Sequence, residues 1–337
     1  MESFKNKCSV VKETMMDNNT LGKRRKVVVV GAGAVGSTFC YALAQSGLAE
    51  EVAVIDQNDN LSQGQVLDLV HGQAFFPTVS IRVGNPCDYA DAQVVVITAG
   101  GAQRPGETRL QLLQKNATIV RSIVDDIVDQ KSIGVILVVS NPVDILTHVV
   151  LKRAGYDRGR VIGSGTVLDS ARFRHLLSEH CGVDIHNVHA NILGEHGDSE
   201  FAAWSMTHVA GLQIDNYCPI CRRCDDWAAE RRKIEQDVRD SAYHIIEYKG
   251  ATYFAIGLAL VRITEAILRG QRSVLTVSTM LDGEFGLHDV CLSVPSIVSE
   301  SGVVKIIESQ LPEHEFAALT ASASILKKVM EELDLDA

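Results

Sequence analysis

The sequence predicts an α/β protein whose first half forms a doubly wound parallel sheet, and two observations support this. Short apolar, β-branched runs recur at residues 27–30, 52–55, 94–98 and 135–139, each followed by glycine or polar residues. A helical pattern at Ala34–Ser46 separates the first two runs. Continuous apolar strands that alternate with helices are typical of a parallel sheet covered on both faces.

A glycine-rich turn, Gly31-Ala32-Gly33-Ala34-Val35-Gly36, follows the first strand. After a buried strand and before a helix, this spacing is typical of a Rossmann dinucleotide site. Gly31 permits a tight turn, Gly33 lets the backbone approach a pyrophosphate, and Gly36 lets the helix pack on the sheet. Asp56 ends the next strand, where its carboxylate can accept ribose hydroxyls and would repel a 2′-phosphate. We therefore expect NAD as the cofactor; the alternative is a structural turn with an incidental aspartate.

The second half has longer helices and shorter strands, as in an α+β domain. Residues 226–248 and 251–269 have helical patterns that meet near Gly250. We expect an N-terminal extension at 1–25, an NAD-binding Rossmann domain at 26–164 and a catalytic, substrate-binding domain at 165–337.

The bulk composition favours a soluble enzyme. The net charge of −10 argues against a nucleic-acid binder, which would carry a basic stripe. The longest apolar runs are far shorter than the ~20 residues of a membrane span, and residues 1–25 lack the apolar core of a secretion signal. Eight cysteines in 337 residues are too sparse for a disulfide scaffold, so we expect a cytoplasmic protein.

Four segments carry the candidate chemistry. They read GGAQRPGETR at 100–109, SNPVD at 140–144, GTVLDSARFR at 165–174 and GEHGDS at 194–199. Together they closely resemble the L-lactate dehydrogenases, within the lactate/malate dehydrogenase family, and the resemblance runs from about Lys26 to the C-terminal helix. It implies reversible hydride transfer between L-lactate and NAD in fermentative glycolysis.

The residue types support a catalytic role for His196. Asp169 and Arg172 lie three apart on an expected helix and so share a face, and the planar guanidinium of Arg172 matches a substrate carboxylate. Asp169 can accept a hydrogen bond from one ring nitrogen of His196, which fixes the tautomer and stabilises the imidazolium. His196 then accepts the hydroxyl proton as hydride leaves the same carbon. The family's catalytic residues match these three positions.

The resemblance implies further site residues. It implies that the loop ending at Arg109 folds over the substrate and brings its guanidinium to the reacting oxygen. Asn141 is expected to bond the same oxygen, through a candidate cis peptide to Pro142. The expected substrate-binding residues are Gln103, Arg109, Asn141, Asp169, Arg172 and Thr252. The expected cofactor-binding residues are Gly31, Gly33, Val35, Gly36, Asp56, Gly100, Gly101, Val139, Asn141 and Ser164.

The residue at position 103, Gln103, indicates which of the family's two activities to expect. Malate dehydrogenases carry an arginine at this lid position, which pairs with the second carboxylate of oxaloacetate. Here the position is neutral, with Arg104 one residue later. Enclosing an unpaired carboxylate costs several kcal/mol, enough for roughly 10³-fold discrimination. We expect lactate and pyruvate as substrates; the alternatives are a malate dehydrogenase with Arg104 turned inward and a non-catalytic structural protein of the same fold.

Arg174 and His189 form a candidate second anion site. Arg172 and Arg174 diverge by roughly 200° around a helix, so Arg174 points away if Arg172 points into the active site. Such an arginine is usually a solvated charge or part of an ion pair. In bacterial lactate dehydrogenases, however, the matching arginine and histidine bind fructose 1,6-bisphosphate across a subunit interface. The resemblance therefore implies allosteric activation and a homotetramer.

Cys218, Cys221 and Cys224 have the two-residue gaps typical of metal-binding turns. A closed zinc site needs a fourth ligand, and no nearby Cys or His continues the spacing; Asp225 is adjacent but a less usual ligand. We expect structural or incidental cysteines and no metal site. A zinc ion and a redox or disulfide role are the alternatives.

Overall fold

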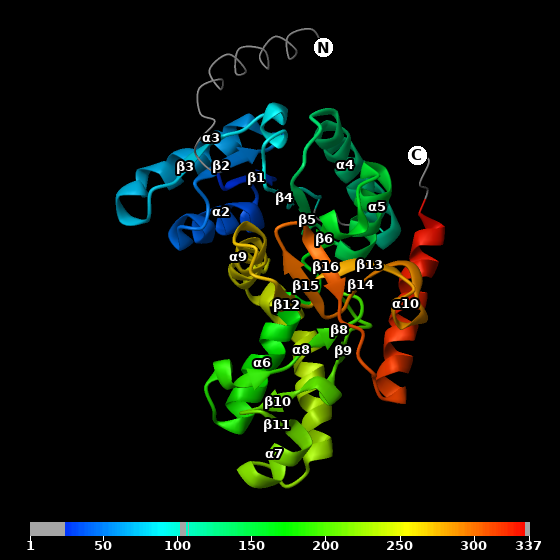
Figure 1. Ribbon diagram of the computed structural model, residues 1–337. Helices are drawn as coiled ribbons and strands as arrows, with labels where there is room; N and C mark the ends of the chain where they lie inside the picture. The colour runs from blue at the N-terminus through cyan, green and yellow to red at the C-terminus, as the bar shows by residue number, and fades with distance from the viewer. Residues whose placement is uncertain (1–23, 102–105, 107, 334–337) are drawn as a thin grey trace.

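The computed structural model describes residues 24–101, 106 and 108–333, and an eight-stranded sheet runs through its upper part (Figure 1). The strand order is β14-β13-β6-β5-β4-β1-β2-β3. Strands β1 to β6 pair in parallel, which confirms the predicted doubly wound sheet. The strands are β1 (Lys26–Val30), β2 (Glu51–Ile55), β3 (Ser80–Val83), β4 (Val94–Ile97), β5 (Val135–Val138), β6 (Val161–Gly163), β13 (Ser278–Asp282) and β14 (His288–Ser293).

Helices cover both faces of this sheet. Alternate residues of β1 face opposite cores, because successive side chains of a strand point to opposite sides. Val28 and Val30 pack in the core that contains α4 and α5, whereas Val27 and Val29 pack in the core that contains α2 and α9. The helices around the sheet are α2 (Ala34–Ser46), α3 (Asp59–His71), α4 (Arg109–Asp129), α5 (Val143–Ala154) and α9 (Phe254–Leu268).

The second half is built from longer helices and short strands, as the sequence predicts. Gly250, with a φ of 83°, ends α8 and separates it from α9. The remaining helices are α6 (Val167–Cys181), α7 (Ile214–Cys221), α8 (Trp227–Lys249) and α10 (Glu313–Glu332). The remaining strands are β7 (Val188–His189), β8 (Ile192–Leu193), β9 (Phe201–Ala202), β10 (His208–Val209), β11 (Leu212–Gln213), β12 (Ser273–Leu275), β15 (Ser296–Ser299) and β16 (Gly302–Ile306). Short 3₁₀ turns lie at Gln73–Phe75, Pro86–Tyr89, Arg158–Arg160, Ile185–Asn187, Trp204–Met206 and Glu284–Gly286.

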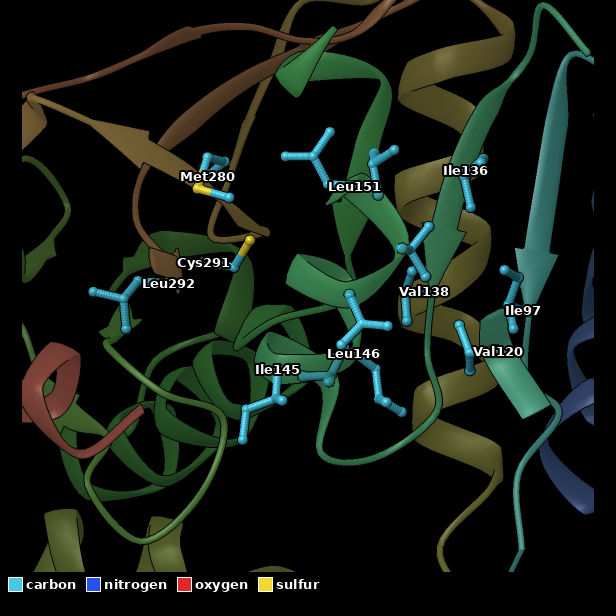
Figure 2. Packing of buried hydrophobic residues seen from close by; sticks show 14 of the residues in the cluster. Ile97, Val120, Ile136, Val138, Ile145, Leu146, Leu151, Met280, Cys291 and Leu292 are labelled. Atoms are coloured by element: carbon cyan, nitrogen blue, oxygen red, sulfur yellow. The ribbon is translucent and has the colours of Figure 1, made fainter. Parts of the chain in front are cut away.

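Strands from the second half extend the sheet of the first. Ser278 of β13 pairs antiparallel with Gly163 of β6, and β14 pairs with β13. Figure 2 shows Met280 and Cys291 of these strands in the same buried cluster as Leu151 of α5. One core therefore includes both halves of the chain. Within the described ranges, no helix has the length and apolarity needed to cross a membrane.

Candidate functional site

The glycine-rich turn after β1 is built tightly against its neighbours. Gly31 has a φ of 109°, and a Cβ there would lie 2.7 Å from the amide nitrogen of Ala99. A Cβ at Gly36 would lie 1.9 Å from the carbonyl oxygen of Gly31, so only glycine fits at these two positions. Gly33 precedes α2, and a Cβ there would meet no atom within 4 Å. The turn thus leaves open space in front of the N–H groups at the start of α2.

The carboxylate of Asp56 lies beside this turn, directly after β2. Its Oδ2 accepts a hydrogen bond from the backbone N–H of Ala32 at 2.7 Å, and its Oδ1 accepts one from Asn58 at 2.9 Å. Asp56 and the glycine-rich turn therefore meet at the carboxyl ends of neighbouring strands, where ligands of doubly wound sheets bind.

Two hydroxyl groups that the sequence analysis did not predict connect the loops at this edge of the sheet. Thr98 Oγ1 donates to the carbonyl of Gly31 at 3.0 Å, and Ser140 Oγ donates to the carbonyl of Ala99 at 2.5 Å. These bonds join the loops after β1, β4 and β5. Among the expected cofactor residues, Val139 and Ser164 are buried after β5 and β6, and Val35 is half-buried in the first turn of α2.

Asn116 on α4 fixes two of the expected loop residues. It accepts a hydrogen bond from the backbone N–H of Gly101 at 2.8 Å and donates one to the carbonyl of Asn141 at 3.0 Å. Its signal in the sequence is a polar residue on the apolar face of a helix, between Leu113 and Val120. The peptide bond between Asn141 and Pro142 is cis, as predicted.

Two hydroxyls at the start of α6 fasten this helix to β8. Thr166 Oγ1 donates to the carbonyl of Ile192 at 2.5 Å, and Ser170 Oγ accepts from the N–H of Ile192 at 2.9 Å. Because all three groups are buried, these bonds fix the position of the helix start. Asp169, in the first turn of α6, is thereby placed beside the segment after β8 that contains His196.

Asp169, His196 and Arg172 form a charged cluster around one carboxylate. Oδ2 of Asp169 lies 2.6 Å from Nδ1 of His196, and Oδ1 lies 2.5 Å from Nη1 of Arg172. Burial alone would lower the pKa of His196, but the charge and hydrogen bond of Asp169 outweigh it and raise the pKa to about 9. The pKa of Asp169 is lowered: burial opposes this shift, and His196 and Arg172 outweigh burial. The cluster therefore favours a protonated imidazole beside an ionised carboxylate.

Two further buried carboxyl groups adjoin His196. Asp144 Oδ2 accepts a hydrogen bond from the backbone N–H of His196 at 2.8 Å, and burial raises the pKa of Asp144 to about 6. Burial, with the charge of Asp169, raises the pKa of Glu200 to about 9. Ligand atoms of Asp169, His196 and Glu200 lie within 4.8 Å of one another. Asp144 lies in the SNPVD segment that the sequence analysis singled out, whereas no sequence pattern indicated Glu200.

The other residues expected to bind the substrate form no comparable cluster among the described residues. Arg109 begins α4 with 85% of its side chain exposed, and its Nη1 lies 3.8 Å from Oδ2 of Asp198, near His196 in the chain. Thr252 is half-buried between α8 and α9. Gln103 and Arg104 lie outside the described residues. The structure brings together His196, Asp169 and Arg172, and no hydrogen bond or ion pair among the described residues joins Asn141 or Thr252 to them.

Arg174 lies on a different side of α6 from Arg172. Its Nε donates to the carbonyl of Ala190 at 3.0 Å, next to the exposed His189. Burial, followed by the positive charge of Arg262, lowers the pKa of Arg174. No carboxylate among the described residues forms an ion pair with it. A partly buried guanidinium thus binds the residue next to an exposed imidazole, and within the described part of the chain no carboxylate neutralises it.

Comparison with known proteins gives matches over nearly the whole chain. Residues 25–163 match the family "lactate/malate dehydrogenase, NAD binding domain", and residues 166–334 match "lactate/malate dehydrogenase, alpha/beta C-terminal domain". An L-lactate dehydrogenase of Treponema denticola is 60% identical, over 93% of this chain and 99% of that protein. L-lactate dehydrogenase 1 of Clostridium acetobutylicum is 49% identical, over 92% and 99%.

Solved structures agree with these matches. The minor L-lactate dehydrogenase of Enterococcus mundtii, in its ligands-bound form, is 42% identical with a TM-score of 0.90, over 93% of this chain and 100% of that chain. A lactate dehydrogenase from a Medee basin deep-sea metagenome library is also 42% identical with a TM-score of 0.90, over 92% and 99%.

Proposed function

The chain belongs to the lactate/malate dehydrogenase family as an NAD-dependent L-lactate dehydrogenase, and on this premise we propose that His196 is its acid–base catalyst. The observation that carries this proposal is the 2.6 Å contact between Nδ1 of His196 and the buried Asp169. It commits Nδ1 to the carboxylate and leaves Nε2 to exchange a proton with the substrate.

The residues of the glycine-rich turn fit NAD. A Cβ would collide at Gly31 and Gly36, whereas the space before Gly33 is open to a pyrophosphate. Asp56 supplies acceptors for ribose hydroxyls and a charge that opposes a 2′-phosphate. When bound, NAD supplies the hydride acceptor for lactate oxidation.

In lactate oxidation Nε2 of His196 accepts the hydroxyl proton, and in pyruvate reduction it returns that proton to the carbonyl oxygen. The raised pKa of about 9 keeps the ring protonated at neutral pH, the form needed for reduction. A histidine positioned in this way contributes roughly 10²–10⁴ in rate. Arg172 holds the substrate carboxylate with the N–H groups that do not contact Asp169. Arg109 polarises the reacting oxygen, with Asn141 and Thr252 as further substrate contacts.

The proposed substrates are L-lactate and pyruvate, in fermentative glycolysis in the cytoplasm. The neutral Gln103 leaves the second carboxylate of oxaloacetate unpaired, which disfavours malate dehydrogenase activity. Initial rates with NADH test this directly. We expect kcat/KM for pyruvate to exceed that for oxaloacetate by roughly 10³. A preference for oxaloacetate would contradict the substrate assignment, and no turnover of either would support a non-catalytic protein.

We also propose activation by fructose 1,6-bisphosphate at Arg174 and His189, within a homotetramer. The partly buried Arg174 without a carboxylate partner supports an anion site, because a desolvated guanidinium favours a negative ligand. Exposed apolar side chains on α2 and α9 support subunit contacts, since such side chains gather at interfaces; they include Tyr41 (56% exposed), Phe254 (64%) and Leu258 (65%). Light scattering after size-exclusion chromatography tests the assembly, and a monomer mass would contradict it.

A further inference from the structure

Three side chains with metal-ligating atoms meet at the end of α6 that lies far from Asp169. They are His180, Cys218 and Cys224, and a ligand atom of each lies within 4.8 Å of the others. The two sulfur atoms are 3.5 Å apart. In Figure 1 this region is where α6 approaches α7, at the opposite end of the molecule from the N-terminal strands.

The two cysteines meet because the chain reverses directly after α7. Arg222 ends this helix in the left-handed conformation, with a φ of 50°, and its backbone N–H donates to the carbonyl of Cys218 at 3.3 Å. A non-glycine residue adopts this conformation at a cost in free energy. The turn brings Cys224 back against Cys218, which is buried.

His180 supplies the ligand that the cysteine spacing alone lacks. It lies in the last turn of α6, its side chain is only 9% exposed, and its Nδ1 lies 3.6 Å from the carboxylate of Glu230. Its Nε2 is buried and has no hydrogen-bond partner among the described residues. Metal-binding histidines commonly direct their other ring nitrogen toward a carboxylate, as seen here. Trp227 packs against the ring, with centroids 5.5 Å apart.

We propose that His180, Cys218 and Cys224 bind a structural zinc ion, with Cys221 as the fourth ligand. Thiolate and imidazole ligands favour zinc, and four of them close a tetrahedral structural site. Cys221 is the last residue of α7, and its thiol donates to the carbonyl of Cys218 at 3.2 Å, outside the group formed by the other three ligands. A rotation of its side chain is therefore required to complete the site. The expectation of no metal rested on a missing ligand in the local sequence, and His180 provides that ligand from another helix.

The ion would tie α7 and the start of α8 to the end of α6. Asp169 and Arg172 lie at the opposite end of α6, so the ion contacts no catalytic group. Its expected effect is therefore on stability and not on turnover. This inference is independent of the proposed acid–base role of His196.

Metal analysis of the full-length chain tests the site. The reduced protein is equilibrated with zinc sulfate, dialysed and analysed by mass spectrometry for metals, and we expect one zinc ion per chain. X-ray absorption should show sulfur ligands at ~2.3 Å and nitrogen at ~2.0 Å. Wild-type protein that retains no zinc, or a spectrum with oxygen ligands only, would overturn the proposal even if every variant misfolds.

Matched alanine variants locate the ion. Cys224→Ala and His180→Ala should lose most of the zinc, whereas Cys291→Ala, at a buried free cysteine in β14, should keep it. A chelator should lower the unfolding temperature of the wild type and of Cys291→Ala, and leave that of Cys224→Ala unchanged. Retention of zinc by Cys224→Ala would overturn the assignment.

Discussion

Asp169 Oδ2 lies 2.6 Å from His196 Nδ1, although the two residues are 27 positions apart in the chain. The contact depends on the hydroxyls of Thr166 and Ser170, which fasten the start of α6 to β8. Because Asp169 is 2% exposed, its charge acts on the imidazole with little screening by water. Asp169 is therefore the main group that raises the pKa of His196.

Asp169→Asn should lower the pKa of His196 from about 9, because burial then acts without the opposing charge. In the wild type, pyruvate reduction should fall as pH rises through about 9, as the imidazolium is lost, and lactate oxidation should rise. In the variant both midpoints should move to lower pH, and reduction at neutral pH should fall by roughly 10²–10⁴. The pH dependence of kcat/KM measures this shift. Equal midpoints in the two proteins would rule out Asp169 as the group that raises the pKa of His196.

Glu200→Gln tests the neutral state of the second acid beside His196. Burial raises the pKa of Glu200 to about 9, so this side chain is protonated at neutral pH and glutamine reproduces its shape and charge. We expect neutral-pH turnover to be almost unchanged. Since an ionised Glu200 raises the pKa of His196, the midpoint of reduction should fall by less than about one pKa unit. A large loss of turnover at neutral pH would show that Glu200 acts as a charged group.

Asp56→Ser should weaken NAD binding and reduce discrimination against NADP. Hydrogen bonds to a charged acceptor contribute about 1.5–3 kcal/mol, so the KM for NAD should rise roughly 10- to 100-fold. The KM for NADP should fall, because the repelling charge is removed. Asp59→Ser, which removes a carboxylate from the first turn of α3, is the matched control and should leave both constants unchanged. If Asp56→Ser left the KM for NAD unchanged, the assignment of Asp56 to the cofactor site would be wrong.

His189→Gln should weaken the response to fructose 1,6-bisphosphate. Loss of one charge-assisted hydrogen bond should raise the half-activating concentration roughly tenfold. The measurement is a titration of activity at low pyruvate concentration. His186→Gln, at another exposed histidine nearby, should behave as the wild type. A wild-type enzyme that does not respond to the bisphosphate would remove the proposed regulation.

Local patterns allowed much of the fold to be predicted from the sequence. Residues 27–30 form a continuous β-branched apolar run, residues 34–46 have a helical pattern, and the glycine spacing between them predicts the tight turn. Asp169 and Arg172 could be paired because helical spacing determines which side chains share a face. Such features depend on a few neighbouring residues, so the sequence displays them directly.

The features that escaped prediction depend on segments far apart in the chain. Glu200 has no local pattern; its importance comes from burial beside His196 and Asp169. His180 joins Cys218 and Cys224 only because the end of α6 lies beside the last turn of α7 and the residues that follow it. Neither relationship has a fixed spacing, so periodicity and motif length could not reveal it.

The pairing of β13 with β6 links the unfolding of the two halves of the chain. If the chain were divided after Gly163, β6 would present an unpaired edge to solvent, and the core around Met280 and Leu151 would be opened. The two core clusters that cover the faces of the sheet would then each be divided between the fragments. Heat or denaturant should consequently unfold both halves in one cooperative transition, with the nucleotide-binding half melting together with the half that holds the acid–base pair.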